Sequence, residues 1–255
     1  MQLGRISENI IRGKQRLRAY LLFESPFRML ILNGMATLTR WLLEAIFHSP
    51  FRRYLLNRYQ YQFSPQQLCF LCQCIADTRD VLGNVAEIGC NRGFTTVFLC
   101  HFMSDMRMQK EYIAVDTFSG FVSDDVAYEI RHRKKRDFMY VGFQVNKKKW
   151  FDAALKQRGI RRVRSIEADV NVLDLCSLGP MSFVLVDVDL YRPTLKSLSE
   201  LYSVLTPGGI IIVDDCNPNN WYWDGAYHAY SEFMRKLGES PKVVFQKLGV
   251  VRKSL

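Results

Sequence analysis

Short apolar runs alternate with helix-like segments through most of the chain from residue 85 onward. Each run has only four or five residues, which is short for a helix and typical of a strand buried on both faces. Strands that alternate with helices form parallel sheets covered by helices on both sides. The predicted strands are Val85–Ile88, Tyr112–Asp116, Arg164–Ala168, Phe183–Asp187 and Ile210–Asp214.

The segments between these runs predict the helices, and the last segment predicts an edge of the sheet. Pro207–Gly209 indicates a turn before the fifth strand. Val243–Phe245 and Val250–Val251 predict a closing antiparallel pair. We therefore expect an α/β fold, a Rossmann-like and mostly parallel sheet with helices on both faces. The predicted helices are Thr95–Phe102, Lys149–Arg158 and Leu195–Leu205.

The first 62 residues differ from the rest because they are basic, helical in pattern and without strand signals. Pro26 and Pro50, each preceded by Ser, break this region into segments, since proline disfavours a helical conformation in the residue before it. We expect two parts, a basic helical extension in residues 1–62 and one α/β domain in residues 63–255.

The α/β domain is expected to begin with a capped helix. Ser64 is placed as the N-cap, Pro65 at the first helical position and Gln67 at the third, which is the pattern of a capping box. Apolar residues at helical spacing then share one face. They are Leu68, Leu71, Cys72 and Ile75.

The formal net charge of +10 is concentrated in two stretches. Residues 1–62 carry ten Arg or Lys against three Glu, and a second basic stretch runs from Arg131 to Arg164. Such clusters attract nucleic acid, anionic lipid or acidic substrates, although a solvated basic surface explains them equally well. The stretch Phe118–Lys149 is expected to lie over the strand ends as a lid. It would either capture an anionic acceptor, such as an anionic glycan, or simply face solvent.

Two further features bear on partners and location. The most apolar stretch, Met29–Phe47, is interrupted by Asn33, Arg40 and Glu44 and falls short of a membrane-spanning helix. It predicts peripheral membrane contact, or packing against the main domain or a second subunit of a homo-oligomer. We expect no signal peptide, and the seven Cys favour reduced thiols in the cytoplasm.

The first strand leads into the turn Glu87-x-Gly89-x-x-x-Gly93. Its spacing differs from the G-x-G-x-x-G that binds a pyrophosphate, and an acid opens it. Glycine lets the backbone approach a ligand closely, and the acid suits a nucleoside cofactor with an ammonium and a carboxylate. Asp116 would accept hydrogen bonds from ribose hydroxyls, and Asp169 from an adenine amino group. This set of residues predicts S-adenosylmethionine as the cofactor.

Carboxylates also follow the fourth and fifth strands, Asp187 and Asp189 after one and Asp214 and Asp215 after the other. Any one of them alone would be interpreted as a helix N-cap, but ligands of open parallel sheets bind at this edge. Carboxylates in one crevice repel each other unless a cation neutralises them or one is protonated. Oxygen ligands favour a hard divalent ion such as Mg²⁺, which would lower the pKa of a bound hydroxyl for attack on the methyl of a sulfonium.

His228 is the histidine nearest this region, on a helix predicted after the fifth strand. An imidazole titrates near neutral pH, so His228 is a candidate general base or acceptor contact. The alternative is a partly buried histidine packed between Tyr227 and Tyr230 without a catalytic role.

Four segments together resemble the macrocin O-methyltransferase family, which consists of metal-dependent class I methyltransferases acting on sugar hydroxyls of natural products. The resemblance covers roughly residues 63–252. It implies a class I methyltransferase fold that uses S-adenosylmethionine. The segments are Glu87–Gly93, VDTFSGF at Val115–Phe121, DVDLYRPTLKSL at Asp187–Leu198 and LTPGGIIIVDDC at Leu205–Cys216.

The resemblance also implies roles for the acids. Asp187, Asp214 and Asp215 would hold Mg²⁺, and Asp187 would help to deprotonate the acceptor. Val188 stands where the family pattern usually has Gly, which bears on how the substrate is placed. The segments WDGAYHAYSEF and KLGVVRK near the end of the chain are more similar to bacterial relatives in sugar or polysaccharide clusters.

Three functions follow from these patterns. The first is a Mg²⁺-assisted O-methyltransferase acting on a sugar or another small hydroxyl compound. The second is an RNA methyltransferase, suggested by the basic charge, although no base-amine motif or RNA-binding module is recognisable. The third is a membrane-surface or scaffold protein that works through residues 1–62, against which the intact set of acids argues.

Overall fold

A computed structural model describes residues 26–50, 60–136, 140, 143–144, 146–221 and 223–254, with the side chains of residues 26–34 and 36 left aside. The chain divides into two units, residues 1–59 and 60–255. The helical segments predicted before Pro26, and the Arg-rich residues 51–59, lie outside the described residues.

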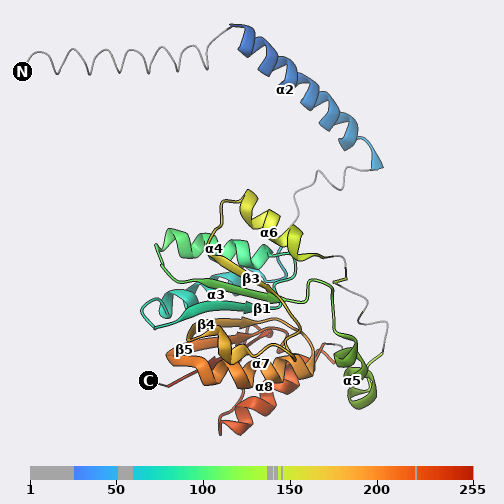
Figure 1. The fold of residues 1–255 in the computed structure, drawn as a ribbon. Helices are drawn as coiled ribbons and strands as arrows, with labels where there is room; N and C mark the ends of the chain where they lie inside the picture. Colours follow the sequence, from blue (N-terminus) through green and yellow to red (C-terminus); the bar gives the residue numbers. More distant parts are fainter. Residues whose placement is uncertain are drawn as a thin grey trace, which may run out of the picture. The chain divides into compact units, whose positions relative to one another are not determined.

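In the first unit, helix α2 spans Pro26–Phe47, so it begins and ends where the two prolines predicted (Figure 1). None of the described helices is long and apolar enough to cross a membrane. Arg40 pairs with Glu44 at 3.1 Å. Contact with a membrane surface or a second subunit stays a prediction for this helix. Its exposed apolar side chains are Met35, Leu38, Trp41, Leu42, Leu43, Ile46 and Phe47.

The second unit is built on one seven-stranded sheet, with the strand order β3-β2-β1-β4-β5-β7-β6. The first five strands in the chain pair in parallel, and β7 pairs antiparallel with β5 and β6. This confirms the predicted mostly parallel sheet and its closing antiparallel pair. The strands are β1 (Asn84–Ile88), β2 (Tyr112–Asp116), β3 (Val163–Glu167), β4 (Met181–Val186), β5 (Leu205–Val213), β6 (Val243–Val244) and β7 (Leu248–Arg252).

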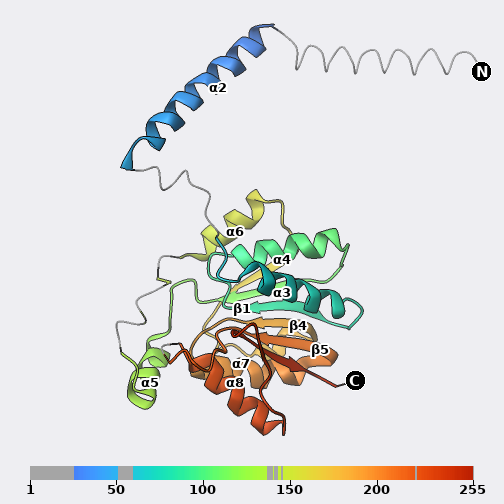
Figure 2. The same ribbon diagram turned by 180° about the vertical axis from the view of Figure 1, so that it is seen from behind.

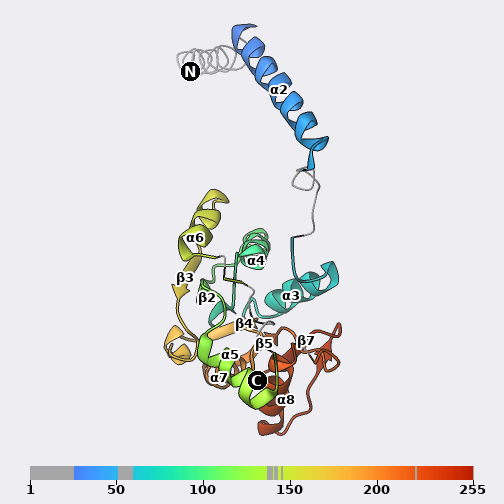
Figure 3. The same cartoon turned by 90° about the vertical axis from the view of Figure 1, so that its right-hand side faces the viewer.

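Helices cover both faces of the sheet because successive side chains of each strand point to opposite faces. One core contains Val85 of β1 with residues of α3, α4 and α6, and the other contains Ala86 with residues of α7 and α8. Figures 1, 2 and 3 show these two layers on either side of the strands. The helices are α3 (Pro65–Asp77), α4 (Phe94–Asp105), α5 (Ser123–Arg133), α6 (Lys148–Gln157), α7 (Tyr191–Val204), α8 (Gly225–Lys236) and the 3₁₀ helix η3 (Leu175–Leu178).

Pro207–Gly209 was predicted to be a turn before the fifth strand, and this prediction was wrong. These residues form a bulge within β5. Leu205 already pairs with Met181 of β4, whereas Ile210 pairs with Phe183, so four residues stand opposite one and bulge out of the ladder. The bulge is tied to the residue just after β7, the strand beside β5, since the Gly208 amide donates to the Lys253 carbonyl at 2.8 Å.

Helix α3 starts with the capping box that its sequence predicted. The Ser64 hydroxyl accepts from the Gln67 amide at 3.3 Å, and the Gln67 side chain accepts from the Ser64 amide at 2.8 Å. Cys74, rather than the predicted Cys72, completes the buried face of this helix, and Cys72 is only partly buried. All seven cysteines are free thiols.

Replacing the cap residue tests this local structure. Ser64→Ala removes the acceptor for the Gln67 amide and is expected to lower the free energy of unfolding by about 1 kcal/mol, measured by urea denaturation. Ser199→Ala is the matched control, because its hydroxyl bonds to the Leu195 carbonyl on an exposed turn of α7. The control should stay within about 0.5 kcal/mol of wild type, and equal losses in both variants would contradict the capping role.

Candidate active site

The candidate site lies where the strand order reverses, at the carboxyl ends of β1 and β4. The chain runs outward from β1 to β3 and then returns to β4 on the other side of β1, and ligands of open α/β sheets bind at such a switch point. Backbone bonds continue past the strand ends, since Gly89 donates to Val115, Asp187 to Ile88 and Asp214 to Val186 at 2.7–2.8 Å. The residues just after the strands are therefore held at one level.

The two glycines of the first turn are required by the packing of the protein itself. Gly89 has φ +89°, and a Cβ there would lie 1.8 Å from the Asp187 carbonyl oxygen. Gly93 has φ +77°, and a Cβ there would lie 2.6 Å from the Phe151 ring. The expected close approach is therefore one of backbone to neighbouring protein, and the left-handed φ makes glycine the suitable residue at both positions.

Glu87 is buried beneath this turn and is held by two hydroxyls. Its Oε2 accepts from the Thr96 hydroxyl at 2.5 Å and from the Tyr112 hydroxyl at 2.8 Å. Burial raises the pKa of Glu87 to about 7, and these two hydrogen bonds only partly oppose that rise. Glu87 also lines a cavity beside the turn, together with Asn91 and Asp187.

Asp116 is oriented by backbone amides at the end of β2. Its Oδ2 accepts from the Asn91 amide at 2.7 Å and its Oδ1 from the Phe118 amide at 2.6 Å. Burial raises the pKa of Asp116, and these amides oppose the rise. The Asn91 carbonyl in turn accepts from the Asn146 side chain at 2.7 Å. Sequence reasoning assigned no role to Asn91 or Asn146, which join the Glu87–Gly93 turn to the predicted ribose acceptor Asp116.

Two adjoining cavities open at this edge of the sheet. The first is lined by Gly89, Asp116 and Asp169, the predicted cofactor residues, and also by Asp187 and Asp189. The second is lined by Glu87 and shares Asp187 with the first. The structure thus brings Glu87, Gly89, Asp116 and Asp169 together with the first pair of acids, whereas Gly93, also predicted to bind the cofactor, lines neither of these two cavities.

The acids after β4 and β5 form a cluster around one lysine, Lys247. Its Nζ lies 2.6 Å from Asp214 Oδ2 and 3.5 Å from Asp215 Oδ1. Burial and mutual repulsion raise the pKa values of Asp187 and Asp189 well above the usual range. Burial opposes the charge on Lys247, but the surrounding carboxylates outweigh it and raise the pKa of the ammonium. Sequence reasoning assigned Lys247 no role.

The residues present fit a divalent cation in their chemistry and charge. Asp214 is buried, and its Oδ1 has no hydrogen-bond partner among the described residues. Lys247 balances one of four neighbouring carboxylates, so formal negative charge remains after it is counted. Oxygen donors of this kind suit Mg²⁺.

The carboxylate oxygens of the three predicted ligands, Asp187, Asp214 and Asp215, do not all lie within 4.8 Å of one another. In the described part of the chain, ligand atoms within 4.8 Å of one another occur in a different group, Asp174, Cys176 and Glu200.

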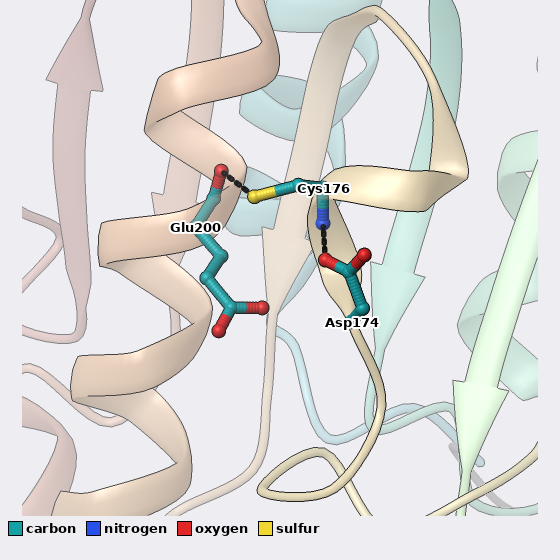
Figure 4. Close-up of side chains that lie close together, drawn as sticks. All are labelled: Asp174, Cys176 and Glu200. Carbon is teal, nitrogen blue, oxygen red and sulfur yellow. Dashed lines mark hydrogen bonds between the residues drawn. The ribbon is translucent and has the colours of Figure 1, made fainter.

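That other group is explained by local structure (Figure 4). Asp174 caps η3 by accepting from the Cys176 amide at 3.0 Å, and the Cys176 thiol bonds to the Glu200 carbonyl at 3.7 Å. Glu200 Oε2 accepts from the Leu175 amide at 2.9 Å and from the Lys196 ammonium at 2.8 Å. These contacts tie η3 to α7, and the group needs no metal.

His228 is not brought to the acids. It lies exposed on α8 with Nε2 3.5 Å from Asp224 Oδ2, and it does not line either of the two cavities. Its ring meets Tyr227 edge-on, while Tyr230 is buried and accepts from the Lys242 and Val250 amides. The role predicted for His228 stays a prediction without support from this geometry.

Two residues of the basic stretch predicted as a lid, Arg133 and Lys135, form ion pairs within the protein. Arg133 binds Glu129 at 2.7 Å and Asp224 at 2.5 Å, and Lys135 binds Asp224 at 2.8 Å. Glu129 also accepts from the Tyr191 amide at 2.8 Å. These pairs join α5 to the starts of α7 and α8, so Arg133 and Lys135 are already matched to acids of the protein.

The chain matches the family model described as Macrocin-O-methyltransferase (TylF) over residues 66–238. No curated protein sequence matches it.

Among solved structures, the chain is similar to the O-methyltransferase NovP, with a TM-score of 0.63 and 16% identity over 78% of this chain and 84% of that one. It is also similar to the calicheamicin methyltransferase CalS11, with a TM-score of 0.56 and 20% identity over 90% and 93%. A Bacillus cereus O-methyltransferase in complex with SAH gives a TM-score of 0.51 and 16% identity over 83% and 90%. At these identities the solved structures establish a shared fold.

The buried Glu87 predicts a pH dependence of stability. Its pKa rises from an ordinary 4.5 to about 7 on folding, so between these values the folded protein holds a proton that the unfolded chain has released. The contribution of Glu87 to the free energy of unfolding therefore falls as the pH rises from about 4.5 to about 7, and it stays constant at higher pH.

Wild type is expected to lose stability relative to Glu87→Gln across the same window, by roughly a few kcal/mol. Urea denaturation at about pH 5, 6, 7 and 8 measures the difference. A difference that does not change with pH would contradict the assignment.

Proposed function

The chain belongs to the macrocin O-methyltransferase family, and on this basis we propose that it transfers a methyl group from S-adenosylmethionine to a hydroxyl of a sugar. The observation that carries the proposal is the first cavity at the switch point of the sheet. Asp116 and Asp169 line one part of it, and the acids Asp187 and Asp189 line another. A cofactor bound by the first pair therefore adjoins the acids that act on an acceptor.

The cofactor side of the cavity suits a nucleoside. Each Asp116 oxygen accepts one backbone amide and retains a lone pair for a ribose hydroxyl. The Asn171 amide donates to Asp169 Oδ1 at 2.8 Å and orients this carboxylate. We propose that Asp169 accepts a hydrogen bond from the adenine amino group. Gly89 lines the same cavity, and Glu87 lines the adjoining one. The bound sulfonium supplies an electrophilic methyl group.

The acceptor side holds groups that take up a proton. Asp187 and Asp189 both line the first cavity, and burial raises their pKa values, which makes each carboxylate a stronger base. We assign proton uptake from the acceptor hydroxyl to Asp189, with Asp187 beside it. Asp189 holds φ +60°, a left-handed conformation that is uncommon outside glycine and is often found at functional sites.

A divalent cation is part of the proposal. Asp187, Asp214 and Asp215 would hold Mg²⁺, which lowers the pKa of a bound hydroxyl. The unpartnered Oδ1 of Asp214 and the excess of carboxylates over Lys247 support this assignment.

The acceptor class comes from relatives and from the site. CalS11 is a TDP-rhamnose 3′-O-methyltransferase, and we propose a sugar hydroxyl as the acceptor here too. Family membership favours an O-methyltransferase over the RNA methyltransferase and the scaffold protein that the charge pattern also allowed. The basic residues Arg131, Lys134 and Arg136 are proposed to attract an anionic glycan or sugar nucleotide.

Calorimetry tests the two ligands separately. Wild type is expected to bind S-adenosylmethionine, and Asp116→Asn to bind it at least about tenfold more weakly because a ribose acceptor is lost. Asp214→Asn should keep cofactor affinity within about threefold and lose Mg²⁺ binding. Asp105→Asn, an exposed acid at the end of α4, is the control and should match wild type in both titrations. The absence of heat with the cofactor in every variant would overturn the proposed function.

The base assignment is tested by turnover. TDP-rhamnose and methyl glycosides of deoxyhexoses serve as acceptors, and transfer is followed with methyl-labelled S-adenosylmethionine. Asp189→Asn is expected to lower kcat at least about 100-fold while cofactor affinity stays within about threefold, as for loss of a general base. Full turnover by Asp189→Asn would exclude it as the base, and failure of every sugar in wild type would argue against a sugar acceptor.

A further inference from the structure

The edge of the sheet that holds the acids carries more negative charge than its one lysine balances. Asp187, Asp189, Asp214 and Asp215 surround Lys247, and the charges of all four act on its ammonium or on one another. Asp214 is 2% exposed, so solvent screens its charge very little. Cations, protons or both must therefore offset the charge of the cluster.

Lys247 is presented by a turn that is unusual for its residues. Val244 to Lys247 form the hairpin between β6 and β7, closed by the Lys247 amide donating to the Val244 carbonyl at 3.2 Å. Both central residues, Phe245 and Gln246, have positive φ, +52° and +56°. Such turns normally use Asn and Gly at these positions, so the backbone here is strained. Surrounding contacts must hold this conformation.

Contacts from two elements hold the strained turn. The centre of the Phe245 ring lies 5.4 Å from that of Phe70 in α3. The backbone carbonyl of Phe245 accepts from the Gln67 side chain at 3.5 Å. The Lys247 carbonyl accepts from the Cys216 amide at 2.6 Å, next to Asp215 in the chain. The hairpin is thereby tied both to α3 and to the segment that carries two of the acids.

The ammonium itself is confined on two sides. It reaches Asp214 Oδ2 at 2.6 Å and Asp215 Oδ1 at 3.5 Å, and it lies 4.7 Å from the centre of the Phe63 ring. The other oxygen of Asp214, Oδ1, has no hydrogen-bond partner among the described residues. Lys247 thus engages two of the carboxylates assigned above to Mg²⁺ and leaves part of Asp214 unsatisfied.

We propose that Lys247 is a resident counter-ion of the acid cluster that competes with a divalent cation for Asp214 and Asp215. Without metal, it holds the cluster together. When a divalent cation binds, Lys247 must give up its bond to Asp214, so the chain binds Mg²⁺ more weakly than the acids alone would. The inference uses the acid site of the proposed function, but it concerns metal affinity and stability and does not depend on the acceptor.

The experiment compares Lys247→Met with wild type in the full chain. Methionine keeps an unbranched side chain and removes the charge. Mg²⁺ titrated calorimetrically into cofactor-free protein is expected to bind Lys247→Met at least about tenfold more tightly, because no ammonium has to be displaced. Without Mg²⁺ the Tm of Lys247→Met should fall by about 5 °C or more, and Mg²⁺ should restore most of the loss.

Two further variants serve as controls. Lys247→Arg retains the charge and should keep Mg²⁺ affinity within about threefold of wild type. Lys253→Met removes a lysine just beyond β7 whose ammonium binds the Tyr202 and Ser203 carbonyls rather than the acids, and it should leave Mg²⁺ affinity unchanged. Titration with S-adenosylmethionine shows that each variant is folded at the cofactor end.

Equal or weaker Mg²⁺ binding by Lys247→Met would overturn the competition, and so would the absence of Mg²⁺ binding by both proteins. An unchanged Tm without metal would overturn the counter-ion role. Absence of Mg²⁺ binding would also remove the divalent cation from the proposed function, whereas failure of the proposed methyl transfer appears separately as absence of cofactor binding in every variant. A Lys247→Met protein that binds cofactor and gains Mg²⁺ affinity supports the proposal.

Discussion

The crowding of four carboxylates at the ends of β4 and β5, with Asp214 buried and the other three partly buried, is the constraint on which the rest of the site depends. Charges removed from water cost several kcal/mol each unless they are paired or protonated. In this chain, Lys247 pairs with Asp214, and raised pKa values favour the protonated forms of Asp187 and Asp189. A cluster that is held partly by a lysine and partly by protons is well suited to exchange these for another cation, and the acids that lose their protons in that exchange are then able to accept one from a substrate.

The scaffold around this cluster links distant parts of the chain. Gln67 accepts from the Ser64 amide through Oε1 and donates to the Phe245 carbonyl through Nε2. The residue that completes the start of α3 therefore also supports the turn that presents Lys247. A substitution of Gln67 would therefore remove both contacts and alter the position of Lys247 next to the acids.

The cofactor end is organised by different forces. Gly89 and Gly93 pass so close to Asp187 and Phe151 that any side chain would collide with them. Asp116 then binds the Asn91 amide, which holds the turn against β2. Together these contacts hold the backbone of the turn in place before a ligand binds, which reduces the conformational entropy lost on binding.

Most of the architecture could be predicted because it rests on local patterns. Short continuous apolar runs predicted the seven strands and their mainly parallel pairing, and the Ser64 capping box was predicted residue by residue. The bulge at Pro207–Gly209 was predicted as a turn, since its pairing with Lys253 is invisible in the sequence around it.

The sequence by itself also determined which acids follow the strands, because the carboxyl ends of parallel strands share one edge. Only the tertiary structure decided what surrounds those acids. Lys247 follows Asp214 by 33 residues, and it reaches that acid because a strained hairpin, fixed by α3, directs it there. His228, a candidate base with a non-catalytic alternative, lies exposed on α8, because the α8 face that packs inward carries Ala226, Ala229 and Tyr230. Contacts between distant segments depend on how whole helices and strands pack, and the spacing of residues within one segment does not determine that packing.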